Sequence, residues 1–491
     1  MQLSQIAKNL LLLIISLILV GFLFSYKLLE IPGELTSDEA SFGYNAVLIS
    51  ETLHDRWGRF LPVFVLGREG ILWYEPVTQY YLVAFFKIFG ASVFNLRFTS
   101  VLITVFSTIL IFILAKELLG KTAAFFASLI FLTTPIVMIQ SHMAMDNIMP
   151  VPFVILWLLS LLFFTKKGNF KYLILAGIFL GIGFYSYKGM RGMVAIWILL
   201  TLIYLKLSYV GSFSQFLKRS SFLSLGILPF FAIIPLLEMK YAGAVFNRYQ
   251  FSWDSIYVFL YPYFSSFDPT FLFLKGDTLS IHSTGKHGMM LLASVPLFII
   301  GCYQAVRKRN FWLFLLTVFF LGPLLYGLVN SVHRASRLMA IIPPYVLLAT
   351  LGGVTLWQAK IKNIFLNTRL FLIAILILMF VNYLNFINYY WFTYPKLTHQ
   401  TENKLKAYKA YKALSEQAKQ RELKPYLDTE VNDGDSGLFF EAIYFDQPIG
   451  RWTDKQTVLL PGSILLTVRR EIPGFTKLDI EIPFRNLQIY Q

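Results

Sequence analysis

The sequence predicts a mainly α-helical bundle that crosses a membrane many times and carries a small α+β domain at its carboxyl end. Of its 491 residues, 56% are hydrophobic and only 14% are charged, whereas soluble domains average roughly 45–50% apolar and 25% charged residues. Apolar stretches of about 20 residues, the length that a helix needs to cross a bilayer, recur as far as residue 390. The composition then becomes polar. Together these observations exclude a soluble enzyme.

We expect about eleven membrane spans. The first, 6–26, has too long an apolar run for a signal peptide and no small-residue cleavage site, so it is expected to remain as an anchor. The other ten predicted spans are 96–118, 122–139, 151–164, 172–187, 193–207, 222–237, 289–306, 311–330, 338–357 and 370–390. Cys302, the sole cysteine, excludes an intrachain disulfide and multi-cysteine metal sites, and is interpreted as a packing thiol.

The net charge of +16 is explained largely by topology. With a cytoplasmic amino terminus, alternate short loops carry clusters of Lys and Arg, as the positive-inside rule expects, so nucleic acid is not an expected partner. The same orientation puts three longer segments outside, namely 27–95, 238–288 and 392–491.

The predicted domains are a membrane domain over 1–391 and an extracytoplasmic soluble domain over 392–491. In the second, the spacing of apolar residues over 405–418 predicts a helix. Runs rich in β-forming residues at 437–445, 457–468 and 478–482 follow, bounded by Pro and Gly, and predict strands.

An acidic pair, Asp38 and Glu39, lies in the first outer loop. Ser37 can cap a short helix there, and the first turn of a helix favours carboxylates, so the two acids can simply decorate a solvated helix start. The alternative is functional, because a carboxylate held at the membrane surface suits a general base. Tyr74, in the same loop, is a candidate cavity residue.

Other ionisable side chains are candidates for the same cavity. His142 and Asp146, four residues apart at the end of an outward-going span, suit a mutual hydrogen bond better than a metal site, because no third ligand is near in sequence. Asp277 and His282 lie among turn-forming residues in the second outer segment, which can be a substrate lid or a solvated loop.

A set of cations departs from the positive-inside pattern because its members fall at predicted outer ends of spans. Arginine matches phosphate oxygens with a fork of donors and lysine supplies a point charge, so a lipid phosphate or pyrophosphate is a suitable partner. The alternative is snorkelling to lipid headgroups. The candidate phosphate-binding residues are Arg97, Lys188, Arg191, Arg334 and Arg337.

Several segments, in this order along the chain, resemble the polyprenol-phosphate-sugar glycosyltransferases of GT-C type, which include the protein O-mannosyltransferases and the lipid A aminoarabinose transferase. The segments are Asp38-Glu-Ala-Ser-Phe-Gly-Tyr44, Arg59-Phe-Leu-Pro62, Tyr74-Glu-Pro76, 89–100, the turn from His142 to Asp146, and 337–344. The resemblance covers roughly residues 30–350, and the first 120 residues are the most specific.

The resemblance implies an inverting sugar transfer in which Asp38 is the base, Glu39 supports it, and Arg97 contacts the donor phosphate. Lys188, and Arg334 or Arg337, resemble further cations of the family. It also implies three kinds of partner, namely a polyprenyl-phosphate-sugar donor, an acceptor and membrane lipids. Lipid, glycan and protein acceptors stay open, because no β-trefoil insert is present and Ser41 stands where the protein mannosyltransferases commonly have His.

No cofactor is assigned and no metal-ligand residue is named. A divalent cation, Mg²⁺ or Mn²⁺, stays open, provided that the fold brings Asp38, Glu39 and Asp146 together. The expected location is a prokaryotic plasma membrane, with the active site facing outside. A transporter or flippase for a lipid-linked or anionic substrate is the alternative function, although the two related halves common in transporters are not found. A third hypothesis is that the protein is a non-catalytic subunit of a membrane assembly.

Overall fold

The computed structural model divides into two compact units by internal contacts, and each is described by itself. The first consists of Met1–Tyr26, Glu75–Thr78 and Ser100–Tyr390, and the second of Lys27–Tyr74, Gln79–Thr99 and Trp391–Gln491. The first outer loop therefore groups with the tail, whereas the predicted two-domain division placed it with the spans; that division stays a prediction. The structure describes residues 2–490 except 34, 68, 69, 71, 209–211, 247–255, 330, 331, 360–366, 399–403, 432, 433, 454–461, 470, 471, 473, 474 and 479–487.

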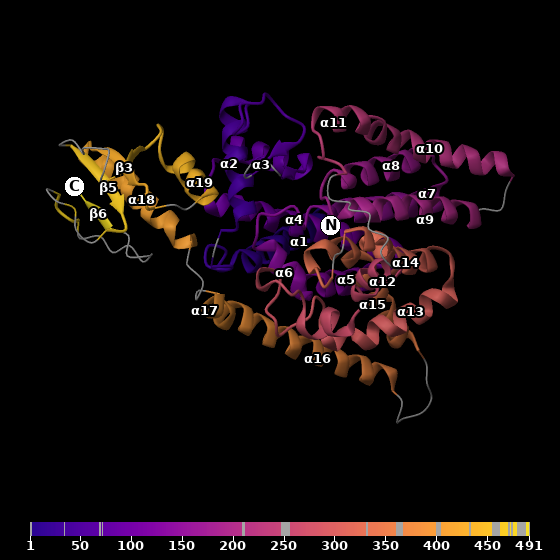
Figure 1. Cartoon of the computed structure of the whole chain (residues 1–491). Helices are drawn as coiled ribbons and strands as arrows, with labels where there is room; N and C mark the ends of the chain where they lie inside the picture. Colours follow the sequence, from indigo (N-terminus) through magenta and orange to yellow (C-terminus); the bar gives the residue numbers. More distant parts are fainter. Residues whose placement is uncertain are drawn as a thin grey trace. The chain divides into compact units, whose positions relative to one another are not determined.

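The first unit is a bundle of apolar helices (Figure 1). Short 3₁₀ and π-helical segments over 270–294 and 322–341 interrupt it. Its helices are α1 (Gln2–Ser25), most of α4 (Val93–Leu119), α5 (Lys121–Thr133), α6 (Pro135–Ser141), α7 (Pro150–Lys167), α8 (Lys171–Phe184), α9 (Met190–Leu207), α10 (Phe213–Ala232), α11 (Ile234–Lys240), α12 (Ile256–Ser265), α13 (Val295–Lys308), α14 (Asn310–Leu321), α15 (Ile342–Gln358) and α16 (Thr368–Asn388).

Within the described residues, seven helices are long and apolar enough to cross a membrane, and the pair α5 and α6, bent by 63°, can form an eighth span. These eight correspond to predicted spans. The other three predicted spans also fall on helices: 6–26 overlaps α1, which is apolar over Ile14–Ser25, 172–187 contains the 14-residue α8, and over 289–306 the helix α13 begins only at Val295. The chain is a multi-pass membrane protein, while the count of eleven remains a prediction.

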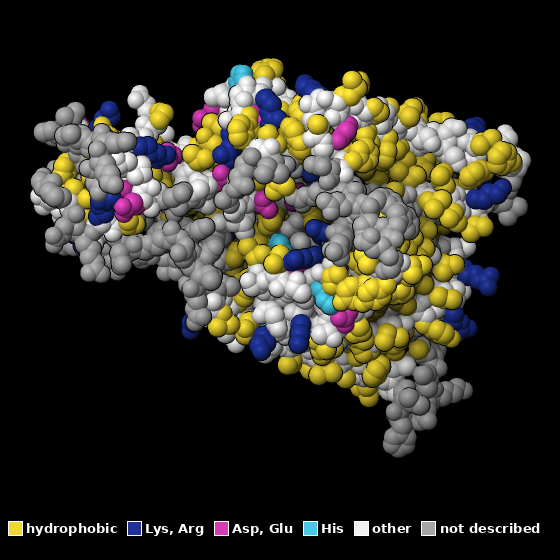
Figure 2. Space-filling model, in the orientation of Figure 1, with side chains coloured by type: hydrophobic (Ala, Val, Ile, Leu, Met, Phe, Trp, Pro, Cys, Tyr) yellow, Lys and Arg dark blue, Asp and Glu magenta, His cyan; other side chains and the backbone are white. Residues whose placement is uncertain are grey.

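Close helix packing in this unit depends on glycine. A Cβ atom on Gly226 of α10 would lie 2.1 Å from the carbonyl oxygen of Ile174 in α8, and one on Gly301 of α13 would lie 1.8 Å from that of Leu348 in α15. Small residues let helices approach closely where lipid removes the hydrophobic driving force. The outward side of α10 keeps large apolar side chains exposed, and Figure 2 shows hydrophobic surface at the upper right, where α10 lies.

The second unit combines the first outer loop with the tail. The loop forms α2 (Ser37–Thr52), a two-stranded antiparallel sheet of β1 (Val65–Leu66) and β2 (Trp73–Tyr74), and most of α3 (Pro76–Phe89). The tail forms α17 (Tyr394–Thr398), α18 (Lys404–Arg421), α19 (Asp435–Tyr444) and a sheet in the order β4-β3-β5-β6. In that sheet β3 (Lys424–Asp428) pairs in parallel with β4 (Gly450–Trp452) and β5 (Ser463–Thr467), and β6 (Gln488–Tyr490) pairs antiparallel with β5.

The predicted helix over 405–418 is α18, but the predicted strand over 437–445 is wrong, because it is the helix α19. A short aromatic run fits either a strand or a buried helix, and packing decides here: Phe439 and Phe440 are fully buried, and Phe439 lies on Gly43 of α2. Of the run 457–468, β5 is a strand. Positions 457–461 and 479–482 lie outside the described residues.

Candidate functional site

Asp38 lies in the first turn of α2, where its side chain is half-buried. The hydroxyl of Tyr74, at the end of β2, donates a hydrogen bond to Asp38 Oδ1 at 3.2 Å. Burial and the Asp38 carboxylate raise the pKa of Tyr74 above its ordinary value, so the phenol remains a donor. The Tyr74 ring packs on Phe42, with 4.2 Å between ring centroids, and Gly67 leaves space for it. Tyr74 therefore orients the carboxylate of Asp38.

Glu39 is fully buried and does two jobs. It closes a capping box at the start of α2, in which Thr36 Oγ1 accepts from the Glu39 N–H at 3.0 Å and the Thr36 N–H donates to Glu39 Oε2 at 3.0 Å. The helix cap is therefore Thr36, not Ser37 as predicted, because Ser37 is already the first helical residue. Glu39 also pairs with Arg97.

Arg97 is fully buried near the start of α4. Its Nε donates to Glu39 Oε1 at 3.0 Å and its Nη2 to Oε2 at 3.3 Å. Its Nη1 donates to the carbonyl oxygens of Leu28 and Pro32 at 3.0 and 3.1 Å. The guanidinium thus joins α2, α4 and the segment before α2. Its charge is paired with a carboxylate of the protein itself, Glu39.

The two neighbouring acids face different surroundings. Successive residues of an α-helix point about 100° apart, at 3.6 residues per turn, so Glu39 turns into the interior while Asp38 keeps part of its side chain open. A buried carboxylate with an arginine partner is held in place. The half-buried Asp38 is the more accessible member of the pair.

A second buried ion pair holds Arg191, at the start of α9. Its Nη2 contacts both carboxylate oxygens of Glu75 at 2.6 Å, and its Nη1 donates to the carbonyl oxygens of Ala244 and Val245 at 2.9 and 2.8 Å. Arg191 is only 3% exposed. Like Arg97, this predicted phosphate ligand is engaged by a glutamate.

Arg334 is held more loosely. Its Nη1 lies 3.6 Å from Asp277 Oδ1, and a third of its side chain is exposed. The carboxylate of Asp277 also accepts hydrogen bonds from the N–H groups of Leu279, at 2.8 Å, and Ala335, at 2.5 Å. Burial raises the pKa of Asp277. The carboxylate therefore stabilises two chain segments, and the guanidinium of Arg334 keeps donors for another acceptor.

His282 is buried next to this network. Gln140 Nε2 lies 3.0 Å from His282 Nδ1, and Gln140 Oε1 accepts from Asn147 at 3.2 Å. Burial, aided by the positive charge of Arg334, lowers the pKa of His282 to about 4. The imidazole is thus neutral at neutral pH and serves as a hydrogen-bonding group.

The other predicted site residues lie outside the α-helices, and Arg337 is in the 3₁₀ helix Ala335–Ile341. Lys188 is half-buried between α8 and α9, and Arg337 is half-buried, with its carbonyl oxygen accepting from the Tyr326 hydroxyl. The helix α6 ends at Ser141, so the expected helical spacing of His142 and Asp146 does not exist. The buried His142 ring instead lies 5.4 Å from the Tyr390 ring, between centroids, and Asp146 is half-buried.

Across the described part of the chain, no group of three or more His, Cys, Asp or Glu side chains could hold a metal ion. Both oxygens of Glu39 already accept from Arg97, and Oε2 also accepts from Thr36. Glu39 is therefore poorly placed to bind a divalent cation.

Sequence reasoning missed Glu75 as a site residue, although it stands beside Tyr74. The sequence could have indicated it, because Glu75 is an acid among apolar residues, and a buried carboxylate needs a cationic partner. Thr36 was missed because two consecutive cap-forming residues, Thr36 and Ser37, precede the acids. Arg56 and Asp435, 379 positions apart, form an ion pair at 3.0 Å that no local pattern could reveal.

Comparison with known proteins supports this picture. Residues 75–237 match the family model described as dolichyl-phosphate-mannose-protein mannosyltransferase. The chain is structurally similar to ArnT from Cupriavidus metallidurans bound to undecaprenyl phosphate, with a TM-score of 0.58, 11% identity and coverage of 97% of both chains. No curated protein matches it by sequence.

A second similar structure is the archaeal oligosaccharyltransferase AglB from Archaeoglobus fulgidus, in complex with an inhibitory peptide and a dolichol-phosphate. The TM-score is 0.50 at 13% identity, over 88% of this chain and 63% of AglB. The chain has the fold of the GT-C membrane glycosyltransferases. The GT-C resemblance predicted from the sequence is therefore confirmed, and the transporter alternative is not favoured.

Proposed function

We propose that this protein is a membrane glycosyltransferase that moves a sugar from a polyprenyl-phosphate donor to an acceptor on the outer face of a prokaryotic plasma membrane. One observation carries the proposal: Asp38 is the accessible acid of a pair whose other member is locked by Arg97. The GT-C fold and the match over 75–237 support the same chemistry. Clusters of Lys and Arg in alternate short loops favour an outward-facing site.

The proposed step is an inverting displacement. The acceptor oxygen or nitrogen forms a bond to the anomeric carbon, the bond from that carbon to the phosphate oxygen breaks, and the leaving polyprenyl phosphate keeps the electron pair. Asp38 accepts the acceptor proton while Tyr74 fixes its other oxygen. A well-placed general base contributes about 10²–10⁴-fold to the rate.

The leaving phosphate needs a cation. Arg334 suits this role, because it is partly exposed and shares its acid with two backbone N–H groups. Arg97 and Arg191 suit a positioning role instead, since each is buried on a glutamate. Lys188, in the turn between α8 and α9, and Arg337, in the 3₁₀ helix Ala335–Ile341, are half-buried and are further candidates for the donor phosphate.

The test is donor consumption by the purified full-length protein in detergent, where transport across a membrane has no meaning. Polyprenyl-phosphate hexoses and pentoses are offered with lipid, glycan and peptide acceptors, and released polyprenyl phosphate is measured. The expected result is release that depends on both donor and acceptor. Inertness with every pair, together with movement of the donor across reconstituted vesicles, would contradict the proposal.

A further inference from the structure

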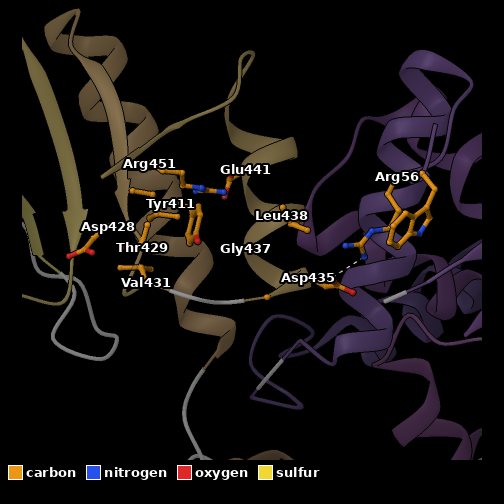
Figure 3. A pocket seen from close by; sticks show the side chains of 13 residues that line it. Arg56, Tyr411, Asp428, Thr429, Val431, Asp435, Gly437, Leu438, Glu441 and Arg451 are labelled. Carbon is orange, nitrogen blue, oxygen red and sulfur yellow. Dashed lines mark hydrogen bonds and ion pairs between the residues drawn. The ribbon is translucent and has the colours of Figure 1, made fainter. Parts of the chain in front are cut away.

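The second unit contains a pocket of about 630 Å³ that includes none of the residues assigned to sugar transfer. Small-molecule sites commonly measure about 300–1,000 Å³. The pocket lies between the first outer loop and the helices and strands of the tail (Figure 3). Its lining includes Arg56, Trp57, Asp435, Glu441 and Arg451.

Two ion pairs provide polar groups on different sides of this pocket (Figure 3). Arg56 Nη1 donates to Asp435 Oδ1 at 3.0 Å, and Arg451 Nη2 donates to Glu441 Oε1 at 2.6 Å. Each pair presents N–H donors beside carboxylate acceptors. Because the positive charge of each arginine is already neutralised by a carboxylate, the pocket has no unpaired cation to attract an anionic ligand.

Asp435 supplies an unused acceptor. The residue is only 7% exposed, and its Oδ2 is buried with no hydrogen-bond partner among the described residues. A buried acceptor left unsatisfied is costly, so a ligand hydroxyl or amine that donates to it is favoured. A purely apolar ligand would leave it unsatisfied.

Trp57 supplies a flat apolar surface. Half of the residue is exposed, while its Nε1 donates to the carbonyl oxygen of Leu66 at 3.1 Å and its backbone N–H to Asp55 Oδ1 at 2.9 Å. These bonds hold the indole in place before any ligand arrives. An exposed, immobilised aromatic ring offers contact area at little cost in conformational entropy.

We propose that this pocket binds an uncharged sugar ring of the acceptor. That the sugar belongs to the acceptor rests on the proposed function. A sugar hydroxyl both donates and accepts, which matches side-by-side guanidinium and carboxylate groups. The C–H face of the ring packs on Trp57, and a hydroxyl donates to Asp435 Oδ2. A phosphate would meet the carboxylates of Asp435 and Glu441. This assigns a glycan or glycolipid acceptor to the enzyme.

The test measures binding to the full-length protein in lauryldimethylamine oxide, a detergent without a sugar headgroup, with no donor added. The probes are methyl glycosides of mannose, glucose, galactose and N-acetylglucosamine, and saturation-transfer NMR reports the contact. Methyl glucosaminide, inorganic phosphate and a Lys-rich peptide serve as comparison ligands. We expect at least one neutral glycoside to bind, and to bind more tightly than any comparison ligand.

Variants locate the site. Trp57→Ala and Glu441→Gln are each expected to weaken binding at least about tenfold, the size of effect that marks a dominant contact, whereas Trp57→Phe keeps an aromatic face and most of the binding. The matched controls are Phe60→Ala, an aromatic that is 62% exposed on the same loop, and Glu416→Gln, whose exposed pair with Lys412 spans 3.7 Å. Both should bind as wild type does. Binding that ignores Trp57→Ala, tighter binding of phosphate or peptide, or no binding of any neutral glycoside would overturn the inference.

The binding test is independent of catalysis. Asp38→Asn protein should bind the glycoside as wild type does, because Asp38 does not line the pocket. If no donor is consumed but glycosides bind at Trp57, the transferase proposal fails and the pocket remains a sugar site. If donor is consumed but glycosides do not bind, only the pocket inference fails.

Discussion

Arg97 and Arg191 differ from Arg334 in what surrounds them, although all three were predicted at outer helix ends. Arg97 and Arg191 are 0% and 3% exposed, and each is bonded to a glutamate and to two backbone carbonyl oxygens. Arg334 keeps 33% of its side chain exposed, and its nearest carboxylate oxygen is 3.6 Å away.

A cation at a helix end therefore does not by itself identify a phosphate site. A guanidinium has five N–H donors, and in Arg97 four hydrogen bonds to protein acceptors occupy its three nitrogens. Such a group supports neighbouring residues. Glu39 is next to Asp38 in the sequence, so its pair with Arg97 helps to fix the start of α2, where Asp38 lies. Arg334 is the most open of the three, which is why the phosphate role is proposed for it.

Glu39→Gln is expected to have the largest effect on stability. It leaves the buried Arg97 charge without its partner, which costs about 3–5 kcal/mol. Thermal unfolding of the purified protein in detergent measures the loss. The control is Glu117→Gln, whose partner Lys166 lies 2.8 Å away with both side chains a third or more exposed, and which should change stability by less than about 1 kcal/mol. Equal effects of the two variants would contradict the structural role of Glu39.

Glu75→Gln should destabilise by about 3 kcal/mol, for the same reason of a buried unpaired charge. The loss is expected to be the smaller of the two, because Glu39 also closes the capping box at the start of α2. The two ion pairs share no residue, so the double variant should lose close to the sum of the single effects. A double variant no less stable than either single variant would contradict the independent stabilising role of the two ion pairs.

The pH dependence of stability tests the surroundings of Arg334. Burial first, and the charge of Arg334 second, lower the pKa of His282 to about 4, from an unfolded value of 6.5. Between those values the unfolded chain binds a proton that the folded protein does not, so stability falls as the pH drops from 6.5 to about 4. Full titration is worth about 3 kcal/mol at about 1.36 kcal/mol per pKa unit.

The variant His282→Gln removes that titration and keeps an amide beside Gln140. Thermal midpoints measured over this pH range should therefore fall less steeply for the variant than for wild type. Identical slopes would show that His282 does not titrate in this window.

Arg334→Gln should have the smallest effect on stability, within about 1 kcal/mol, because the ion pair with Asp277 is long and partly exposed. Its effect should fall on the donor, raising the KM for polyprenyl-phosphate sugar about tenfold through a lost charge-assisted contact. Arg369→Gln, at an exposed position on α16, is the control and should leave the KM unchanged. An unchanged KM for Arg334→Gln would return the phosphate role to Lys188 or Arg337.

Sequence alone predicts much of the fold, because apolar stretches of membrane length and polar helical spacing are local signals. It also places the acidic pair at the start of a helix, with a predicted cap, Ser37, one residue after the observed cap, Thr36. The prediction was wrong at 437–445, where the burial of Phe439 against α2 overrides an aromatic run typical of a strand.

The site was harder to predict than the fold. Glu39 and Arg97 are 58 residues apart, and Glu75 and Arg191 are 116 apart, so no local spacing pairs them. Each arginine matches a phosphate ligand by residue type and position. Only three-dimensional packing shows that a glutamate of the chain already occupies its fork.

The most direct test of the account is sugar transfer by Asp38→Asn. Asparagine keeps the shape and can still accept the hydrogen bond from Tyr74, so folding and donor binding should be retained while the base is lost. We expect transfer from the polyprenyl-phosphate sugar to fall by about 10²–10⁴-fold, with an unchanged thermal midpoint and donor affinity. Transfer at the wild-type rate by the folded variant would contradict the assignment of Asp38 as the base.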